Sequence, residues 1–252
     1  MPERVRHRER ATMGWRMHLG VIWPTPLPAW VIQEFYEVVP PGVDITVSTL
    51  TIRQLSVEEQ EKALAGIEQA ADQLANFEVD MIYFMGIPLL TLKGPGYDRE
   101  VIARIQKVSH LPASTGITGV MEGFRKLSLR RLIVATPFED AVNQRIKIFL
   151  EAEGFEVVHM KGLQIRRNVE FRKLPVSAHF SFTRQVVRES PAEADGIYIP
   201  CLGWGSIHNI PYLEEDLGKP VITGFNAMIW YTMKMMGVQG SVLGYGKLLE
   251  TM

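Results

Sequence analysis

The chain has 252 residues, enough for one large domain or two smaller ones, and its 46% hydrophobic and 22% charged content is ordinary for a globular protein. A net charge of −1 argues against a basic surface for nucleic acid or for an anionic membrane. No apolar run approaches the ~20 residues that a membrane-spanning helix needs.

Residues 1–16 are rich in arginine and lack the apolar segment of a secretory signal, so we expect a solvated tail. Strands and helices then alternate, and the loop 23–26 follows the first strand at its carboxyl end. Ser56 and Glu59 form a capping-box pattern at the start of the clearest helix. Up to residue 114 the pattern predicts strands at 17–22, 45–50, 81–84 and 111–114, and helices at 28–38, 56–74 and 98–107.

The second part of the chain continues the alternation. Glu139 and Asp140 suit the first turn of a helix, and Gly154 is a natural residue to end it. Residues 161–175 are predicted to be a basic, irregular connection whose arginines fit a solvated face better than a binding patch. The pattern predicts strands at 132–135, 155–159, 197–199 and 221–222, and helices at 114–127, 139–150, 179–188, 207–217 and 225–236.

Short sequence echoes relate the two parts. Residues 80–86 (Asp-Met-Ile-Tyr-Phe-Met-Gly) align with 195–201 (Asp-Gly-Ile-Tyr-Ile-Pro-Cys), so Gly86 falls at the position of Cys201. Weaker echoes relate 111–119 to 219–224 and 21–26 to 133–137. Three echoes in one order indicate two pseudo-symmetric α/β halves, each with a parallel four-stranded sheet. We expect a first half of 17–112 plus 222–252, a second half of 113–221, and the site between them.

Cys201 is the only cysteine of the chain, and it falls where a strand ends and a glycine-rich turn begins. Ligands of open α/β sheets bind at the carboxyl ends of strands, where backbone N–H groups favour anions and thiolates. A core cysteine packing as a small hydrophobe is the alternative, but it does not require Gly203 and Gly205 beside it. A single cysteine also fits a cytoplasmic location, and the scattered histidines predict no metal site.

This arrangement resembles the aspartate/glutamate racemase superfamily, and within it the arylmalonate decarboxylase and maleate cis-trans isomerase branch. The resemblance covers about residues 20–248 and is most specific over 135–143 (Ala-Thr-Pro-Phe-Glu-Asp-Ala-Val-Asn), 154–157, 201–203 and 244–248. It implies two flavodoxin-like halves that enclose the site. Racemases and maleate isomerases usually carry one cysteine from each half, whereas the decarboxylases have glycine at the first position. Gly86 and Cys201 match the decarboxylase pattern.

The resemblance therefore implies a cofactor-independent lyase or isomerase that acts at the α-carbon of a carboxylic acid, with Cys201 as its single acid/base. The partner would be a small-molecule carboxylate, and the oligomeric state stays open. We expect Trp23, Trp204 and Tyr83 near the site. The residues expected to bind substrate are Gly86, Ile87, Thr25, Thr136, Phe138, Leu202 and Gly203.

Three hydrogen-bond donors common in that branch are absent from this chain. Two hydroxyl residues usually follow the first cysteine or glycine, where this chain has Ile87 and Pro88, and Phe138 stands where the family has a tyrosine. The resemblance thus implies a more apolar site than in the relatives. The remaining candidate donors are the hydroxyls of Thr25, Thr136 and Ser206 and the backbone N–H groups of Ile87, Leu202 and Gly203.

Three functions stay open on the sequence. The first is an arylmalonate decarboxylase-like lyase, or a maleate isomerase- or racemase-like enzyme with another substrate. The second is a catalytically silent small-molecule binding protein of the same fold. The third, a nucleotide binder, is the weakest, because neither GxGxxG after a strand nor a P-loop occurs.

Overall fold

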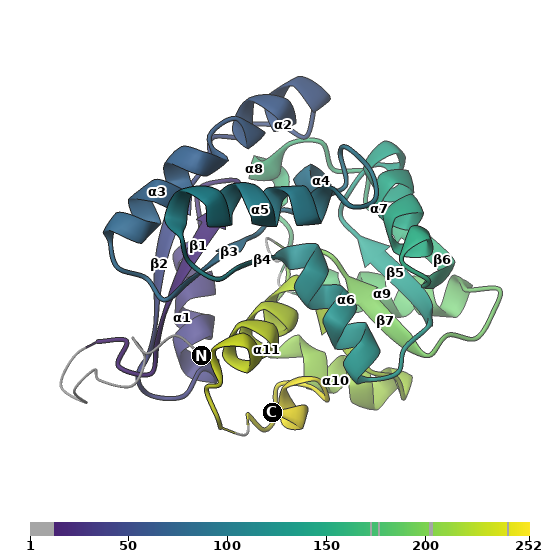
Figure 1. The fold of residues 1–252 in the computed structure, drawn as a ribbon. Helices are drawn as coiled ribbons and strands as arrows, with labels where there is room; N and C mark the ends of the chain where they lie inside the picture. Colours follow the sequence, from purple (N-terminus) through teal and green to yellow (C-terminus); the bar gives the residue numbers. More distant parts are fainter. Residues whose placement is uncertain (1–12, 172, 176, 202–203, 241) are drawn as a thin grey trace.

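The computed structural model describes residues 13–171, 173–175, 177–201, 204–240 and 242–252, and its strands form two four-stranded sheets. The strand orders are β2-β1-β3-β4 and β6-β5-β7-β8, and every pairing within them is parallel (Figure 1). The expected pair of parallel four-stranded α/β halves is therefore confirmed. The strands are β1 Met17–Trp23, β2 Val43–Thr49, β3 Met81–Phe84, β4 Ala113–Thr115, β5 Arg131–Thr136, β6 Glu156–Gly162, β7 Gly196–Ile199 and β8 Val221–Thr223.

The equivalent strands β3 and β7 lie in the interior of their sheets and come from the strongest sequence echo. Every residue of both strands is buried, including the large side chains of Tyr83 and Tyr198. Strands of a parallel sheet that is covered on both faces are apolar throughout, which is why these segments do not alternate. The helices that cover the sheets are α1 Ala29–Val38, α2 Val57–Leu64, α3 Ile67–Asn76, α4 Ile87–Leu90, α5 Tyr97–Ser109, α6 Gly116–Lys126, α7 Asp140–Ala152, α8 Asn168–Phe171, α9 Ala178–Glu189, α10 Asn209–Leu217 and α11 Gly224–Met236.

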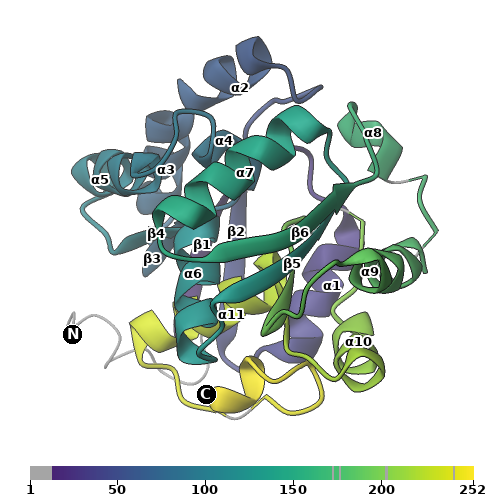
Figure 2. The same cartoon turned by 90° about the vertical axis from the view of Figure 1, so that its right-hand side faces the viewer.

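Helices α6 and α11 pack against each other between the two halves (Figures 1 and 2). Each begins directly after the last strand of a sheet, and each is capped by the threonine that ends that strand. Thr115 accepts the Thr118 N–H at 3.3 Å, while Thr223 accepts the N–H groups of Phe225 and Asn226 at 3.2 Å. Threonine satisfies N–H groups that have no partner inside the helix, so it fixes the helix start.

The helix predicted over 56–74 is two helices in the structure. Helix α2 ends at Leu64, and α3 begins after Gly66. Ser56 does cap α2 by accepting the Glu59 N–H at 3.4 Å, but the Glu59 carboxylate accepts from the Arg53 N–H instead of closing the box. Glycine favours a helix break because holding its backbone in helical geometry costs more conformational entropy than for other residues.

The connection predicted as irregular over 161–175 is also partly ordered. Strand β6 continues to Gly162, and the short helix α8 follows it. The structure further places β4 in the first sheet and β8 in the second, although residue 113 was predicted to open the second half. The division of the chain into domains at 113 and 222 itself stays a prediction.

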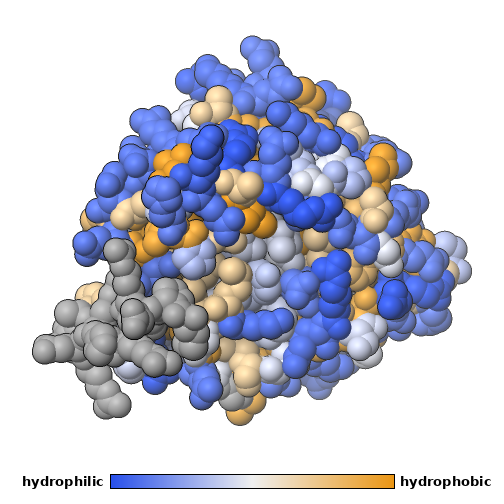
Figure 3. Space-filling view, in the orientation of Figure 1, coloured by the Kyte–Doolittle hydropathy of each residue, from blue (hydrophilic) through white to orange (hydrophobic). Residues whose placement is uncertain are grey.

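The face drawn in Figure 3 is mostly hydrophilic, with apolar side chains scattered between the charged ones. Scattered apolar residues are usual on the surface of a folded protein. None of the helices in the described part of the chain has the length and apolar character to cross a membrane.

Candidate active site

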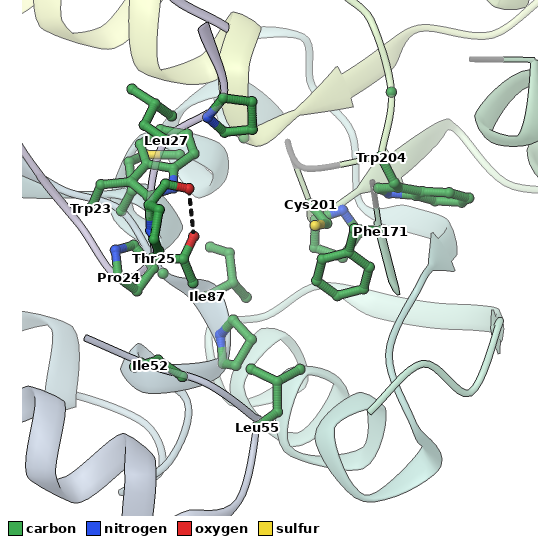
Figure 4. Close-up of a pocket in the computed structure, with 18 of the residues that line it drawn as sticks. Trp23, Pro24, Thr25, Leu27, Ile52, Leu55, Ile87, Phe171, Cys201 and Trp204 are labelled. Atoms are coloured by element: carbon green, nitrogen blue, oxygen red, sulfur yellow. Dashed lines mark hydrogen bonds between the residues drawn. The ribbon is translucent and has the colours of Figure 1, made fainter. Parts of the chain in front are cut away.

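A cavity of about 1220 Å³ lies at the carboxyl ends of strands from both sheets. Its walls come from the segments after β1, β2 and β3 in the first half and after β5, β6, β7 and β8 in the second. Most of these residues are apolar, as Figure 4 shows for part of the wall. The expectation that the site lies between the two halves agrees with this position, which is where open α/β folds bind ligands.

Cys201 follows the buried strand β7 and is half-buried. Its sulfur faces the cavity, with Trp23 and Thr25 on the opposite side and Phe171 beside it (Figure 4). The strand fixes the thiol position because its residues pair on both sides, with β5 and with β8. The structure thus brings the only thiol of the chain to the wall of a large apolar cavity.

Gly86 lies two residues after the end of the equivalent strand β3 and lines the same cavity. Its φ of 129° lies in the region that side chains rarely adopt, so the turn itself favours glycine. A Cβ built there would meet Pro24 Cγ no closer than 3.4 Å, which is ordinary contact. The obstacle to a side chain at this position is therefore the backbone conformation and not the space.

The three positions at which the resemblance would place hydroxyl groups all form apolar wall. Ile87, Pro88 and Phe138 line the cavity, and the side chains of Ile87 and Phe138 are buried. Ile87 and Pro88 belong to the first turn of α4, where a proline is tolerated because it has no N–H to satisfy. The cavity wall is accordingly apolar at all three positions.

Thr136 was expected to line the pocket but is not among the residues that line the cavity. Its side chain is fully buried, donates to Asn143 Oδ1 at 2.6 Å and accepts the Phe138 N–H at 3.1 Å. Thr136 therefore shapes the turn that carries Phe138. Two more of the predicted residues, Leu202 and Gly203, lie outside the described residues.

Two other hydroxyl groups were expected as donors, those of Thr25 and Ser206, and they differ in how many hydrogen bonds they already make to the protein. Thr25 lines the cavity, and its hydroxyl donates only a long bond of 3.4 Å to the Pro26 carbonyl. Ser206 also lines the cavity, but its hydroxyl donates to Glu34 Oε1 at 2.5 Å and accepts the His208 N–H at 3.2 Å. Thr25 is thus the better placed of the two hydroxyls to meet a ligand.

Glu34 on α1 is a wall residue that the sequence interpretation missed. Besides Ser206 it holds the Ile207 N–H, which donates to Glu34 Oε2 at 3.1 Å. One turn further along α1, Glu37 Oε2 lies 2.8 Å from His208 Nε2. Two acidic residues of the first half therefore fasten the segment that follows Cys201. In the sequence, the only sign of this arrangement is that Glu34 and Glu37 lie three residues apart on one helix. That spacing does not reveal that Glu34 contacts Ser206, 172 residues away.

Trp204 supports the same segment from the second half. Trp204 is one of the residues that line the cavity, and its buried ring packs edge-on against His179 and Phe182, with centroid separations of 5.5 and 5.9 Å. Burial lowers the pKa of His179 to about 4, so this imidazole is neutral near pH 7. Gly205 contacts it so closely that a Cβ would lie 2.5 Å from His179 Cδ2.

Trp23 and Trp204 both line the cavity, as expected. Tyr83 does not line it, because its side chain is fully buried. In the described part of the chain, no three or more His, Cys, Asp or Glu side chains are grouped to hold a metal ion.

Comparison with known proteins gives one consistent result. A profile of the family described as arylmalonate decarboxylase matches residues 19–249. The arylmalonate decarboxylase of Bordetella bronchiseptica is 24% identical over 211 residues, which are 83% of this chain and 88% of that protein. The maleate isomerase of Nocardia farcinica is 22% identical over 218 residues, covering 83% and 86% of the two chains.

Solved structures of both enzymes share the fold. A liganded variant of arylmalonate decarboxylase, with a glycine-to-cysteine and a cysteine-to-serine change, superposes with a TM-score of 0.86 at 22% identity, covering 94% of this chain and 100% of that one. A maleate isomerase from Pseudomonas putida with maleate, in which a cysteine is replaced by alanine, gives a TM-score of 0.84 at 20% identity, covering 93% and 97%.

Proposed function

The chain belongs to the arylmalonate decarboxylase family, and from that premise we propose that it is a cofactor-independent lyase or isomerase acting at the α-carbon of a carboxylic acid. Cys201 is its acid/base, and one observation carries the proposal. The only thiol of the chain faces a cavity between the halves, and the equivalent strand end carries Gly86, which has no side chain.

The reaction that suits one thiol is loss of a carboxylate followed by protonation. The bond from the α-carbon to the departing carboxylate breaks, carbon dioxide leaves, and the electron pair stays on the α-carbon as an enediolate. The Cys201 thiol then transfers its proton to that carbon, and the thiolate regains a proton from solvent. General acid–base work of this kind contributes on the order of 10²–10⁴-fold in rate.

The apolar wall supports the decarboxylation step. Ile87, Pro88 and Phe138 would surround the departing carboxylate with groups that do not solvate its charge. The carboxylate that remains needs a donor, and the Thr25 hydroxyl is the candidate that faces the cavity. A racemase- or isomerase-like reaction finds less support, because no second thiol is available to serve the other face of the enediolate.

A catalytically silent small-molecule binding protein is the second candidate. The observation that favours it is the small number of donors, since the hydroxyls of Thr136 and Ser206 already serve other protein groups. Reactivity of the thiol separates the two candidates. Fast alkylation of Cys201 by iodoacetamide at neutral pH supports the enzyme, and slow alkylation supports the binder.

The direct experiment is turnover of arylmalonates, maleate and 2-arylpropionates in D₂O, followed by NMR. We expect one substrate class to be converted by the wild type, with deuterium entering the α-carbon. Cys201→Ala should abolish turnover while the protein stays folded, since a truncation of that size costs about 1–2 kcal/mol. Cys201→Ser is the matched control for shape, because it keeps a hydroxyl of similar size but not the acidity of the thiol.

Full activity in Cys201→Ala would show that the thiol is not the acid/base. No turnover of any substrate by the wild type, together with slow alkylation of Cys201, would favour the binding protein.

A further inference from the structure

Two arginines lie on the cavity wall at corresponding places of the two halves. Arg53 is in the segment between β2 and α2, and Arg167 is in the segment between β6 and α8. Both residues are exposed at the cavity rim. The two segments also touch, because Gln54 pairs with Arg167 in an isolated bridge and the Leu55 N–H donates to the Arg166 carbonyl at 3.4 Å.

Neither guanidinium group has an acidic partner among the described residues. Glu59 and Glu170 are close along the chain, but they accept from the backbone N–H groups of Arg53 and Arg167, at 3.3 and 3.1 Å. The neighbouring Arg166 differs, since its side chain pairs with Glu139 at 2.6 Å.

The acidic residue on the cavity wall does not balance these charges. Glu34 is buried, and its two oxygens already accept from Ser206 and from the Ile207 N–H. The guanidinium groups of Arg53 and Arg167 can therefore pair with a ligand at the rim. Among the described residues of the wall, no carboxylate is free to compete for them. A planar guanidinium matches a carboxylate with two parallel hydrogen bonds.

The stretch of wall near the arginines is apolar, with Ile52, Leu55 and Phe171 among its residues. The cavity volume of about 1220 Å³ exceeds the roughly 300–1,000 Å³ usual for ligand pockets. A small dicarboxylate alone would leave most of this space empty. The cavity thus fits a ligand with a bulky apolar body.

We propose that the substrate carries a second carboxylate at the far end of an apolar body, held at the rim by Arg53 and Arg167. This inference rests on the proposed function, because it places the reacting carboxylate at Cys201. The distal group takes no part in the reaction. It sets which carboxylic acids bind, through a charge contact that needs both halves of the chain.

Binding of two probes tests the proposal without any need for turnover. The probes are biphenyl-4-acetate and its analogue with a 4′-carboxylate, and binding is followed by quenching of the tryptophans, of which Trp23, Trp30 and Trp204 line the cavity. At low salt we expect the dicarboxylate to bind on the order of tenfold more tightly to the wild type, an advantage that added salt reduces.

The advantage should vanish in the double variant Arg53→Gln/Arg167→Gln, whereas biphenyl-4-acetate should bind that variant as it binds the wild type. Arg166→Gln is the matched control and should keep the advantage. Equal binding of the two probes to the wild type, or an advantage that survives the double variant, would overturn the proposal.

Repeating the titrations with Cys201→Ala separates this inference from the proposed function. Tighter binding of the dicarboxylate without turnover of any substrate would support the rim site and contradict the proposed enzyme function. Turnover that depends on Cys201, without tighter binding of the dicarboxylate, would support the enzyme function and contradict the rim site.

Discussion

Gly86 and Cys201 each lie two residues after the end of an equivalent strand, β3 and β7, and both line the cavity. Of the two positions, only that of Cys201 carries a side chain that can exchange a proton. The conformation of Gly86, with φ at 129°, shows that the first position is built for glycine. The two halves therefore differ in the residue that they present to the cavity, although their strands have the same order.

Replacing Gly86 by cysteine should add a proton carrier on the other face of an enediolate. We expect Gly86→Cys to racemise 2-arylpropionates faster than the wild type, as measured by chiral chromatography. The variant should also be less stable by about 1–3 kcal/mol, because a side chain is strained at that φ. Gly86→Ala shares the strain without the thiol, so equal racemisation by both variants would contradict the argument.

Protonation of His179 gives a second prediction at this scale. Its pKa is about 4 in the folded protein against 6.5 for an exposed histidine, because burial disfavours the charged imidazole. Below pH 6.5 the unfolded chain takes up this proton first. The stability that the neutral His179 contributes is therefore complete above pH 6.5 and is lost as the pH falls to about 4.

The loss corresponds to roughly 3 kcal/mol over that range. Urea denaturation of the wild type and of His179→Leu at a series of pH values measures it. The unfolding free energy of the wild type minus that of His179→Leu should become smaller as the pH is lowered from 7 to 4. A constant difference from pH 7 to pH 4 would show that His179 does not stay neutral in the folded state.

Among the elements, α1 has a role that its sequence does not show. It belongs to the first half, yet Glu34 holds Ser206 and the Ile207 N–H in the segment that follows Cys201. A buried hydrogen bond to a charged group contributes about 1.5–3 kcal/mol. Helix α1 thus positions the segment that leads away from the thiol.

Glu34→Gln should lower kcat for whichever acid is turned over, and it should speed hydrogen exchange at the Ile207 amide. The amide of glutamine can accept only at its oxygen, so it cannot hold both the Ser206 hydroxyl and the Ile207 N–H as the carboxylate does. Glu37→Gln is the control, because its exposed pair with His208 should contribute less than about 1 kcal/mol. Unchanged exchange at Ile207 in Glu34→Gln would remove the positioning role.

The order of elements was predictable from the sequence, because buried strands and one-sided helices leave clear patterns. The echo between 80–86 and 195–201 even indicated the shared topology. The break at Gly66 and the short helix α8 were missed, since they depend on local turns that periodicity does not record.

Part of the candidate site was predictable for the same reason. Cys201, Gly86, Ile87, Thr25 and Phe138 do line the cavity, because each follows a strand end. Thr136 also ends a strand, but its side chain turns inward to Asn143. The contacts of Glu34 join distant parts of the chain and leave no local pattern, so only the folded structure reveals them.

At the scale of the whole molecule, the cavity couples the two halves, since residues from both line it. A carboxylate bound there should stabilise both sheets together. We expect biphenyl-4-acetate at 100 times its Kd to raise the unfolding free energy by about 2.7 kcal/mol. Calorimetry should show one transition moving to higher temperature. Two transitions, of which only one moves, would mean that the ligand contacts a single half.

Because the two sheets have the same strand order, the chain can be compared with a symmetric dimer of two identical half-length chains. Two identical polypeptides arranged about a two-fold axis must carry the same residue at both equivalent strand ends. A symmetric dimer of half-length chains would therefore hold two cysteines or two glycines. Joining the halves into one polypeptide releases this constraint, because each position is then specified by its own codon. The pairing of Gly86 with Cys201 in one cavity is a difference that two identical half-length chains could not carry.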